Sequence, residues 1–204
     1  MVFLLMAYAE NPRLIPVLAR SAWNAKPPKV GCISHQISKI TIHHTATLSK
    51  DNSKTPKRMY RYQSYHQSKG WIDIAYHYLI DQEGNVYEGR RTSCAGDTGT
   101  NYDPTGHLLI VLEGNFEAQK PTEKAKKSLV RLMTYGSANY RVPIEEIHGH
   151  RDVAATQCPG QSLFAELEEL KRQALVFQTE KQIFQLQLLS AEEGKRRVRE
   201  IEQK

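Results

Sequence analysis

The sequence of 204 residues has no apolar run that approaches the length of a membrane-spanning helix, which requires about 20 apolar residues. It also has no internal repeat and no low-complexity segment, which excludes a repeat array. Basic residues exceed acidic ones by 28 to 22 for a net charge of +6. They are dispersed apart from residues 195–197, and no nucleic-acid-binding motif accompanies them. The sequence therefore gives no support to a membrane span or to a nucleic-acid partner.

Cysteine is scarce and odd in number, with Cys32, Cys94 and Cys158 lying far apart in the chain. Cys158 is the candidate metal ligand discussed below. Cys32 and Cys94 can be free or can form a disulfide, and sequence spacing alone does not decide between these states.

The length and the content of 40% hydrophobic and 25% charged residues suit one globular domain with an appendage. We expect this domain over residues 19–172, after an N-terminal segment (1–18) and before a helical extension (173–204). The first nine residues are apolar and end in Ala-Tyr-Ala, a pattern typical of a signal-peptide cleavage site. They predict the remnant of a signal peptide and an extracytoplasmic location, periplasmic or secreted.

Hydrophobic periodicity predicts an α/β fold in which helices flank a central mixed β-sheet. Strands are expected at residues 37–43, 71–80, 86–89 and 108–112, of which the second and third form a hairpin. Helices are expected near residues 14–19 and at 55–68, 121–140 and 162–170, and the last helical pattern continues to residue 204.

Residues 148–160 bring two imidazoles and a thiol into a short segment that ends in Pro-Gly. Histidine and cysteine are the side chains that bind zinc best, so this segment predicts a metal site. Either His148 or His150 can pair with Cys158.

A further ligand is expected from the end of the strand at residues 37–43, where His43 and His44 stand side by side. Adjacent strand residues face opposite sides, so only one of the two reaches the metal. We propose His43, His150 and Cys158, and a register shift of one residue would replace His43 by His44. Three protein ligands leave the fourth position to water, as in a catalytic zinc site.

Five motifs resemble, in order, those of the zinc amidases related to phage T7 lysozyme and to the peptidoglycan recognition proteins. They occupy residues 43–45, 70–78, 84–90, 114–116 and 149–160, and the resemblance covers roughly residues 19–170. It implies one zinc ion per chain and hydrolysis of the amide between N-acetylmuramic acid and L-alanine in peptidoglycan or a muropeptide. The alternative is a non-catalytic peptidoglycan receptor, but receptors of this family typically lack the ligand cysteine that this chain keeps.

The resemblance also implies roles for individual side chains. Tyr76 matches the active-site tyrosine of the family, and Thr156 occupies a position where a hydroxyl can support the reaction. The residues expected to line the substrate groove are Arg90, Arg91, Asn115 and His44.

Three departures from the family pattern limit what the resemblance implies. Residues 47–56 contain no cysteine, whereas many animal members have a disulfide there, so we expect a bacterial or phage relative. Arg91-Thr92 and residues 96–98 differ from relatives in the stretch that contacts the stem peptide, so a preference for diaminopimelate or lysine stems does not follow. Cytosolic wall-recycling amidases use Asp where Cys158 stands, which argues against that activity.

Overall fold

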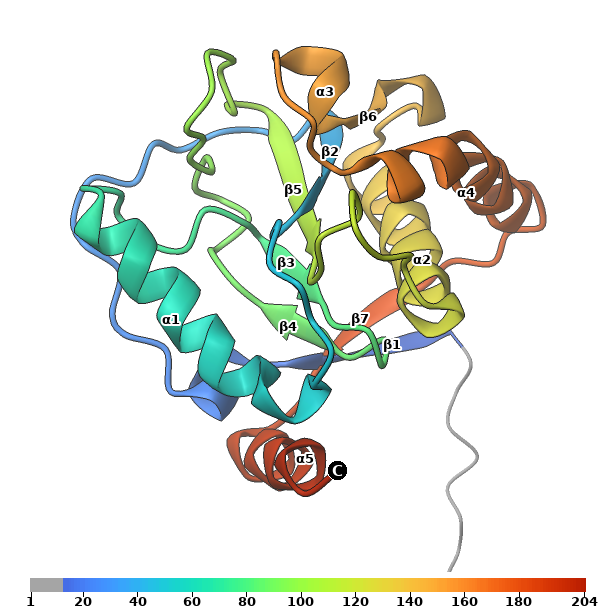
Figure 1. Ribbon diagram of the computed structural model, residues 1–204. Coiled ribbons are helices and arrows are strands. Elements are labelled where there is room, and N and C mark those ends of the chain that lie inside the picture. Colours follow the sequence, from blue (N-terminus) through green and yellow to red (C-terminus); the bar gives the residue numbers. More distant parts are fainter. Residues whose placement is uncertain (1–12) are drawn as a thin grey trace, which may run out of the picture.

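A computed structural model describes residues 13–204, whose strands form one seven-stranded sheet (Figure 1). The expected mixed sheet is confirmed, because all neighbouring strands are parallel except β3 and β4, which form the expected hairpin. From one edge to the other the strands are β6 (Ile147–Gly149), β2 (Lys39–His44), β5 (His107–Leu112), β3 (Tyr78–Ile80), β4 (Val86–Glu88), β1 (Leu14–Leu18) and β7 (Gln185–Leu188).

Helices cover both faces of the sheet (Figure 1). Helices α2 (Glu123–Tyr140) and α4 (Gln161–Thr179) pack on one face and α1 (Thr55–Ser68) on the other. Side chains alternate between the two faces, so Ile110 of β5 lies in the α2 and α4 core while Val111 lies in the α1 core. This burial on both faces explains the continuous apolar sequence of the central strands.

Two predicted helices have the expected boundaries for recognisable reasons. Helix α1 is followed by Gly70, whose φ of +92° lies in the left-handed region that favours glycine at a helix end. Helix α2 begins after Thr122, whose hydroxyl accepts a hydrogen bond from the amide of Ala125.

Near the N-terminus the expected short helix at residues 14–19 is wrong, because this segment is strand β1. Ile15 and Val17 are each 1% exposed and Pro16 between them is exposed, which is the alternation of a strand. Residues 1–12, which include the expected signal-peptide pattern, lie outside the described residues.

The expected strand at residues 71–80 is also shorter than predicted and begins only at Tyr78. Before it, side chains rather than a neighbouring strand accept the hydrogen bonds of two backbone amides. The amide of Ile74 donates to the Asp73 carboxylate, and the amide of Ala75 donates to Nδ1 of His66. The irregular backbone that results carries Tyr76.

The helix expected to continue to residue 204 is interrupted. Helix α4 ends at Thr179, β7 joins the sheet beside β1, and a separate helix α5 (Ala191–Glu202) follows. Helix α5 contacts the short helix η1 (Arg20–Trp23) and buries Val198 and Ile201. Strands β1 and β7 thus belong to the main sheet although they lie outside the domain boundaries expected at residues 19 and 172.

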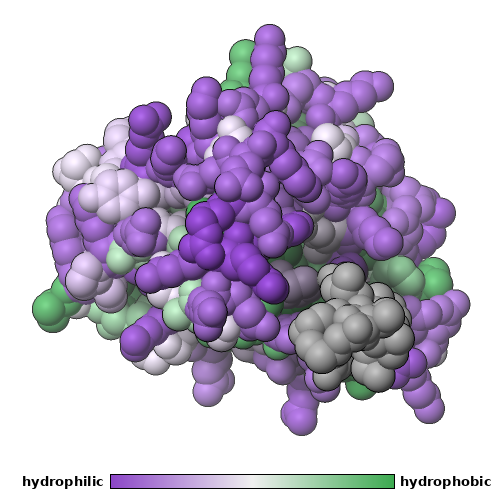
Figure 2. Space-filling model, turned by 90° about the horizontal axis from the view of Figure 1, so that it is seen from below, coloured by the Kyte–Doolittle hydropathy of each residue, from purple (hydrophilic) through white to green (hydrophobic). Residues whose placement is uncertain are grey.

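The face viewed from below is predominantly hydrophilic, with apolar residues in small separate patches (Figure 2). Within residues 13–204, no helix is both long enough and apolar enough to cross a membrane.

Candidate metal centre

The ends of two neighbouring strands and one loop bring three metal-binding side chains together. Strands β2 and β6 pair in the register Ile42 to Gly149, so the residues that follow, His43 and His150, lie side by side with ring centroids 4.5 Å apart. Cys158 reaches them from the loop after the short helix α3 (His150–Val153). One potential ligand atom from each residue lies within 4.8 Å of the others.

The same geometry separates the alternatives that the sequence left open. His44 points away from the cluster, where its Nδ1 accepts a hydrogen bond from the amide of Phe116 at 3.3 Å. His148 lies on β6 with its Nε2 3.5 Å from a carboxylate oxygen of Glu146. Neither residue belongs to the clustered set.

The donor set has the chemistry and the spacing that zinc requires. The Sγ of Cys158 lies 3.7 Å from Nδ1 of His43. Tetrahedral zinc, with bonds of about 2.3 Å to sulfur and about 2.1 Å to nitrogen, separates two such atoms by roughly 3.6 Å. The residues present therefore fit a zinc ion.

Burial controls the protonation of these ligands. It lowers the pKa of His43 well below its ordinary value, with a smaller contribution from His150. It also lowers the pKa of His150 to about 4, so both imidazoles are neutral near pH 7, as metal ligands must be. Burial raises the pKa of the Cys158 thiol to about 12, although the amide of His44, which donates to its Sγ at 3.3 Å, acts in the opposite direction.

The two residues expected to support the reaction both adjoin the cluster. The ring of Tyr76 lies 5.2 Å from the ring of His43, and burial raises the pKa of its hydroxyl, which stays protonated as a hydrogen-bond donor. The hydroxyl of Thr156 accepts a hydrogen bond from the amide of Cys158 at 3.2 Å and so orders the loop that carries this ligand.

Arg90, which the sequence predicts to line the groove, is buried, and its guanidinium group is bonded within the protein. Its side chain is 3% exposed, and it donates to the carbonyl oxygens of Asp73, Ile74 and Ala95. It also forms an ion pair with Asp97. The glycine-arginine pattern in the sequence could not distinguish a ligand-binding arginine from this buried anchor.

The roles of the other three expected groove residues remain predictions, and these residues differ in solvent exposure. Arg91 is exposed, while Asn115 is half-buried and accepts a hydrogen bond from the amide of Glu117 at 3.2 Å. His44 is 8% exposed.

Two further residues adjoin the centre, and the sequence does not predict either of them. The hydroxyl of Thr100 lies 2.9 Å from Nε2 of His150. The ring of Tyr102 lies 5.1 Å from the His150 ring, and its buried hydroxyl has no partner among the described residues. Both stand in a loop with no periodic pattern, about 50 residues from His150, so no sequence signal could have found them.

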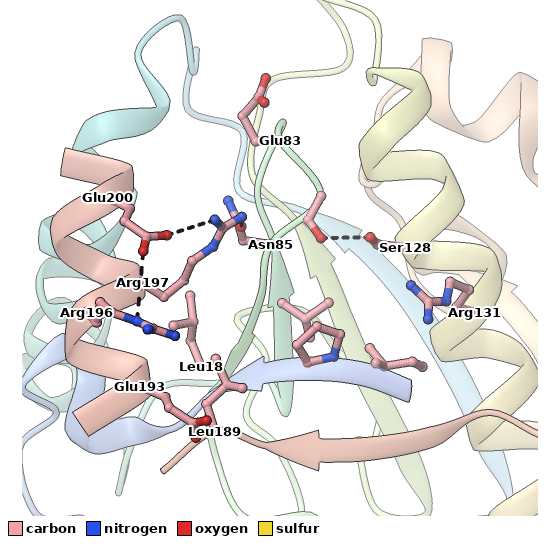
Figure 3. A pocket seen from close by; sticks show the side chains of 14 residues that line it. Leu18, Glu83, Asn85, Ser128, Arg131, Leu189, Glu193, Arg196, Arg197 and Glu200 are labelled. Carbon is pink, nitrogen blue, oxygen red and sulfur yellow. Dashed lines mark hydrogen bonds and ion pairs between the residues drawn. The ribbon is translucent and has the colours of Figure 1, made fainter. Parts of the chain in front are cut away.

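A pocket at the other edge of the sheet, between α5, β4 and α2, offers no comparable chemistry (Figure 3). Arg197 pairs with Glu200 at 3.1 Å and donates to Asn85 at 3.0 Å. Arg196 lies 3.9 Å from Glu200. The pocket lining contains neither histidine nor cysteine, so the His-His-Cys cluster is the candidate functional site.

Comparison with known proteins adds independent information. The sequence pattern of one family, described as N-acetylmuramoyl-L-alanine amidase, matches residues 34–161. The chain is 35% identical to peptidoglycan-recognition protein SD of Drosophila simulans, over 76% of this chain and 86% of that protein. It is 33% identical to peptidoglycan recognition protein 1 of Mus musculus, over 72% of this chain and 84% of that protein.

Solved structures agree with the fold. The crystal structure of Drosophila peptidoglycan recognition protein SD aligns with a TM-score of 0.70 and 33% identity, covering 76% of this chain and 94% of that one. The N-acetylmuramoyl-L-alanine amidase LysC from Clostridium intestinale aligns with a TM-score of 0.62, covering 78% and 96%, and at 24% identity it supports the fold alone. The expectation of a bacterial or phage relative, drawn from residues 47–56, is not supported, since animal proteins share a third of the aligned residues.

Proposed function

This chain belongs to the N-acetylmuramoyl-L-alanine amidase family, and we propose on that premise that it is a zinc-dependent enzyme acting on peptidoglycan or its fragments. The bond cleaved is the amide between the lactyl group of N-acetylmuramic acid and L-alanine. The relatives named as peptidoglycan recognition proteins support the choice of ligand.

The observation that carries the proposal is the convergence of His43, His150 and Cys158, whose ligand atoms lie within 4.8 Å of one another. These residues would hold the zinc. Zinc bound by three protein ligands supplies an acidified water and polarises a carbonyl group.

The surrounding side chains support amide hydrolysis. The protonated hydroxyl of Tyr76, beside His43, can donate a hydrogen bond to the oxyanion of the substrate or orient the attacking water. Thr156 holds the loop of Cys158 in place through the 3.2 Å contact with its amide. The side chain of His44 points to the opposite face of β2, but its backbone amide donates to the Cys158 sulfur.

The second candidate function is a peptidoglycan receptor without activity. It is favoured by the names of the relatives reported above, which describe recognition rather than hydrolysis. The presence of Cys158 favours the enzyme, because the non-catalytic receptors of this family typically lack that ligand.

An extracytoplasmic location is part of the proposal. Cys32 and Cys94 form a disulfide, and disulfides persist mainly in oxidising compartments. Such a compartment is also where intact peptidoglycan is accessible.

Release of new L-alanine amino termini from purified peptidoglycan tests the proposal. We expect release by the wild-type protein, its loss with a chelator, and its return when zinc is added. Cys158→Ser should release nothing while still sedimenting with insoluble peptidoglycan. Binding to peptidoglycan without release by zinc-supplied wild-type protein would overturn the enzyme and establish the receptor.

A further inference from the structure

We infer that residues 97–102 form an outer support of the metal centre in which Thr100 is a positioning residue for His150. The inference rests on the proposed zinc site. The contact that carries it joins the hydroxyl oxygen of Thr100 and Nε2 of His150 at 2.9 Å.

This contact determines which nitrogen of His150 is available to a metal. A neutral imidazole has one N–H and one lone pair, so a ring that donates through Nε2 presents its lone pair at Nδ1. Metal-bound histidines are commonly fixed in this way by a second hydrogen bond. In the tautomer that presents the Nδ1 lone pair, Nε2 carries the proton, and Thr100 accepts it and so stabilises this tautomer and the ring orientation.

Thr98 fixes the hydroxyl of Thr100 in turn. The two hydroxyl oxygens lie 2.8 Å apart, and the backbone amide of Thr100 donates to the hydroxyl of Thr98 at 3.1 Å. Because Thr100 accepts from His150, its own hydroxyl proton is free to donate to Thr98. The hydrogen bonds then run in one direction, from His150 to Thr100 to Thr98.

The beginning of this loop is anchored to the protein core. Asp97 forms an ion pair with Arg90, which is itself held by three backbone carbonyl oxygens. A buried arginine with these partners fixes the position of Asp97, three residues before Thr100. This anchoring gives Arg90, the arginine of the Gly89-Arg90 pair, a role inside the protein.

Tyr102 closes the other end of the loop against the same histidine. Its ring lies 5.1 Å from the ring of His150 and 5.3 Å from that of His107. The hydroxyl has no partner among the described residues, so ring packing holds this side chain in place. His150 is therefore restrained by a hydrogen bond on its edge and by an aromatic ring beside it.

The sequence of the loop agrees with this role. Residues 96–98 are Gly-Asp-Thr, in the stretch where the sequence departs from the family pattern. In the structure Asp97 faces Arg90 and Thr98 faces Thr100. Both side chains therefore make contacts within the protein that support the loop.

The test measures zinc affinity by competition with a chelator of known affinity, in the full chain. Thr100→Val keeps the shape of the side chain but removes the hydroxyl, and it should weaken zinc binding about 10- to 100-fold. Thr100→Ser restores the hydroxyl and should bind zinc as the wild type does. Thr179→Val removes a hydroxyl from the exposed end of α4 and serves as the matched control.

A spectroscopic measurement separates positioning from general loss of structure. Long-range correlation of ring protons and nitrogens in the zinc-loaded protein should show His150 protonated at Nε2 in the wild type and in Thr100→Ser. Thr98→Val leaves Thr100 in contact with His150 and should weaken zinc binding relative to the wild type, by less than Thr100→Val does. The comparison of Thr98→Val with the wild type keeps the test valid if Thr100→Val folds poorly.

Each outcome bears on a different claim. Equal zinc affinity in wild type, Thr100→Val and Thr98→Val would overturn the role of the loop and leave the zinc enzyme intact. A wild-type protein that binds no zinc would overturn both proposals. Zinc binding without release of L-alanine amino termini would contradict the enzyme but not the positioning of His150.

Discussion

Neighbouring histidines on β2 have different roles because a strand directs adjacent side chains to opposite faces. His43 faces Tyr76 and Cys158. The ring of His44 faces Phe116, and only its backbone amide contacts the cysteine, to whose sulfur it donates a hydrogen bond. The sequence placed both histidines at the end of a strand but could not fix the register. Pairing of β2 with β6, which no local pattern specifies, determines which histidine joins His150.

At the same scale, Tyr76→Phe tests the hydroxyl beside the metal centre. Removing one donor to a developing oxyanion typically costs about 10²- to 10³-fold in kcat. We expect a loss of this size in release of L-alanine amino termini, with zinc content and thermal midpoint unchanged. Tyr60→Phe, which alters an exposed tyrosine on α1, is the control, and full activity in Tyr76→Phe would exclude a catalytic role.

Elements with a strong periodic pattern were predicted well, and those held by distant contacts were not. The apolar stripe of α2 and the glycine after α1 are local signals, and the structure confirms both helices. Strand β7 has no such signal. It forms because β1 offers a free edge, and this pairing interrupts a segment whose charge pattern suggested a continuous helix.

The disulfide between Cys32 and Cys94 joins a loop before β2 to the loop that leads to residues 97–102. It closes a chain segment with a sequence separation of 62 residues, for which loop entropy predicts a contribution of about 4 kcal/mol to the free energy of unfolding. We expect the double variant Cys32→Ala, Cys94→Ala to lose about 2–4 kcal/mol in urea unfolding.

Reductant provides the internal control for this prediction. It should lower the stability of the wild-type protein toward that of the double variant and leave the variant unchanged. Equal unfolding midpoints in oxidised wild type and double variant would show that the link contributes nothing.

For the whole molecule, buried neutral histidines make stability depend on pH. Burial lowers the pKa of His77 to about 3 and that of His66 to about 4, against about 6.5 in an unfolded chain. The unfolded state then binds more protons, so stability is full above pH 6.5 and falls as the pH decreases toward the folded pKa values. The charge of Arg90 also lowers both pKa values, whereas Asp73 raises that of His66 and the hydrogen bond to the Cys94 carbonyl raises that of His77, and burial outweighs both.

Urea unfolding in the presence of a chelator measures this effect without a contribution from bound metal. Between pH 6.5 and 5, where most carboxylates stay ionised, each histidine should cost on the order of 2 kcal/mol. His66→Gln should reduce the pH-dependent loss of unfolding free energy by the contribution of one histidine. A midpoint that stays constant from pH 6.5 to 5 would contradict the prediction.

For the whole chain, the sequence predicted the family and the candidate metal ligands but not the contacts that support them. Motif order was sufficient to place the chain in its family and to name the three clustered residues, because those motifs lie at strand ends and in loops. It did not reveal the support from Thr100 and Tyr102 or the internal role of Arg90. Those contacts depend on burial and on partners far apart in sequence.

Zinc content of the purified protein, determined by elemental analysis, tests the central claim most directly. We predict about one zinc per wild-type chain, as expected for a site with three protein ligands, and a strong reduction in folded Cys158→Ser. Folded wild-type protein that takes up no zinc when zinc is supplied would contradict the account, because His43, His150 and Cys158 would then converge without binding the metal they fit.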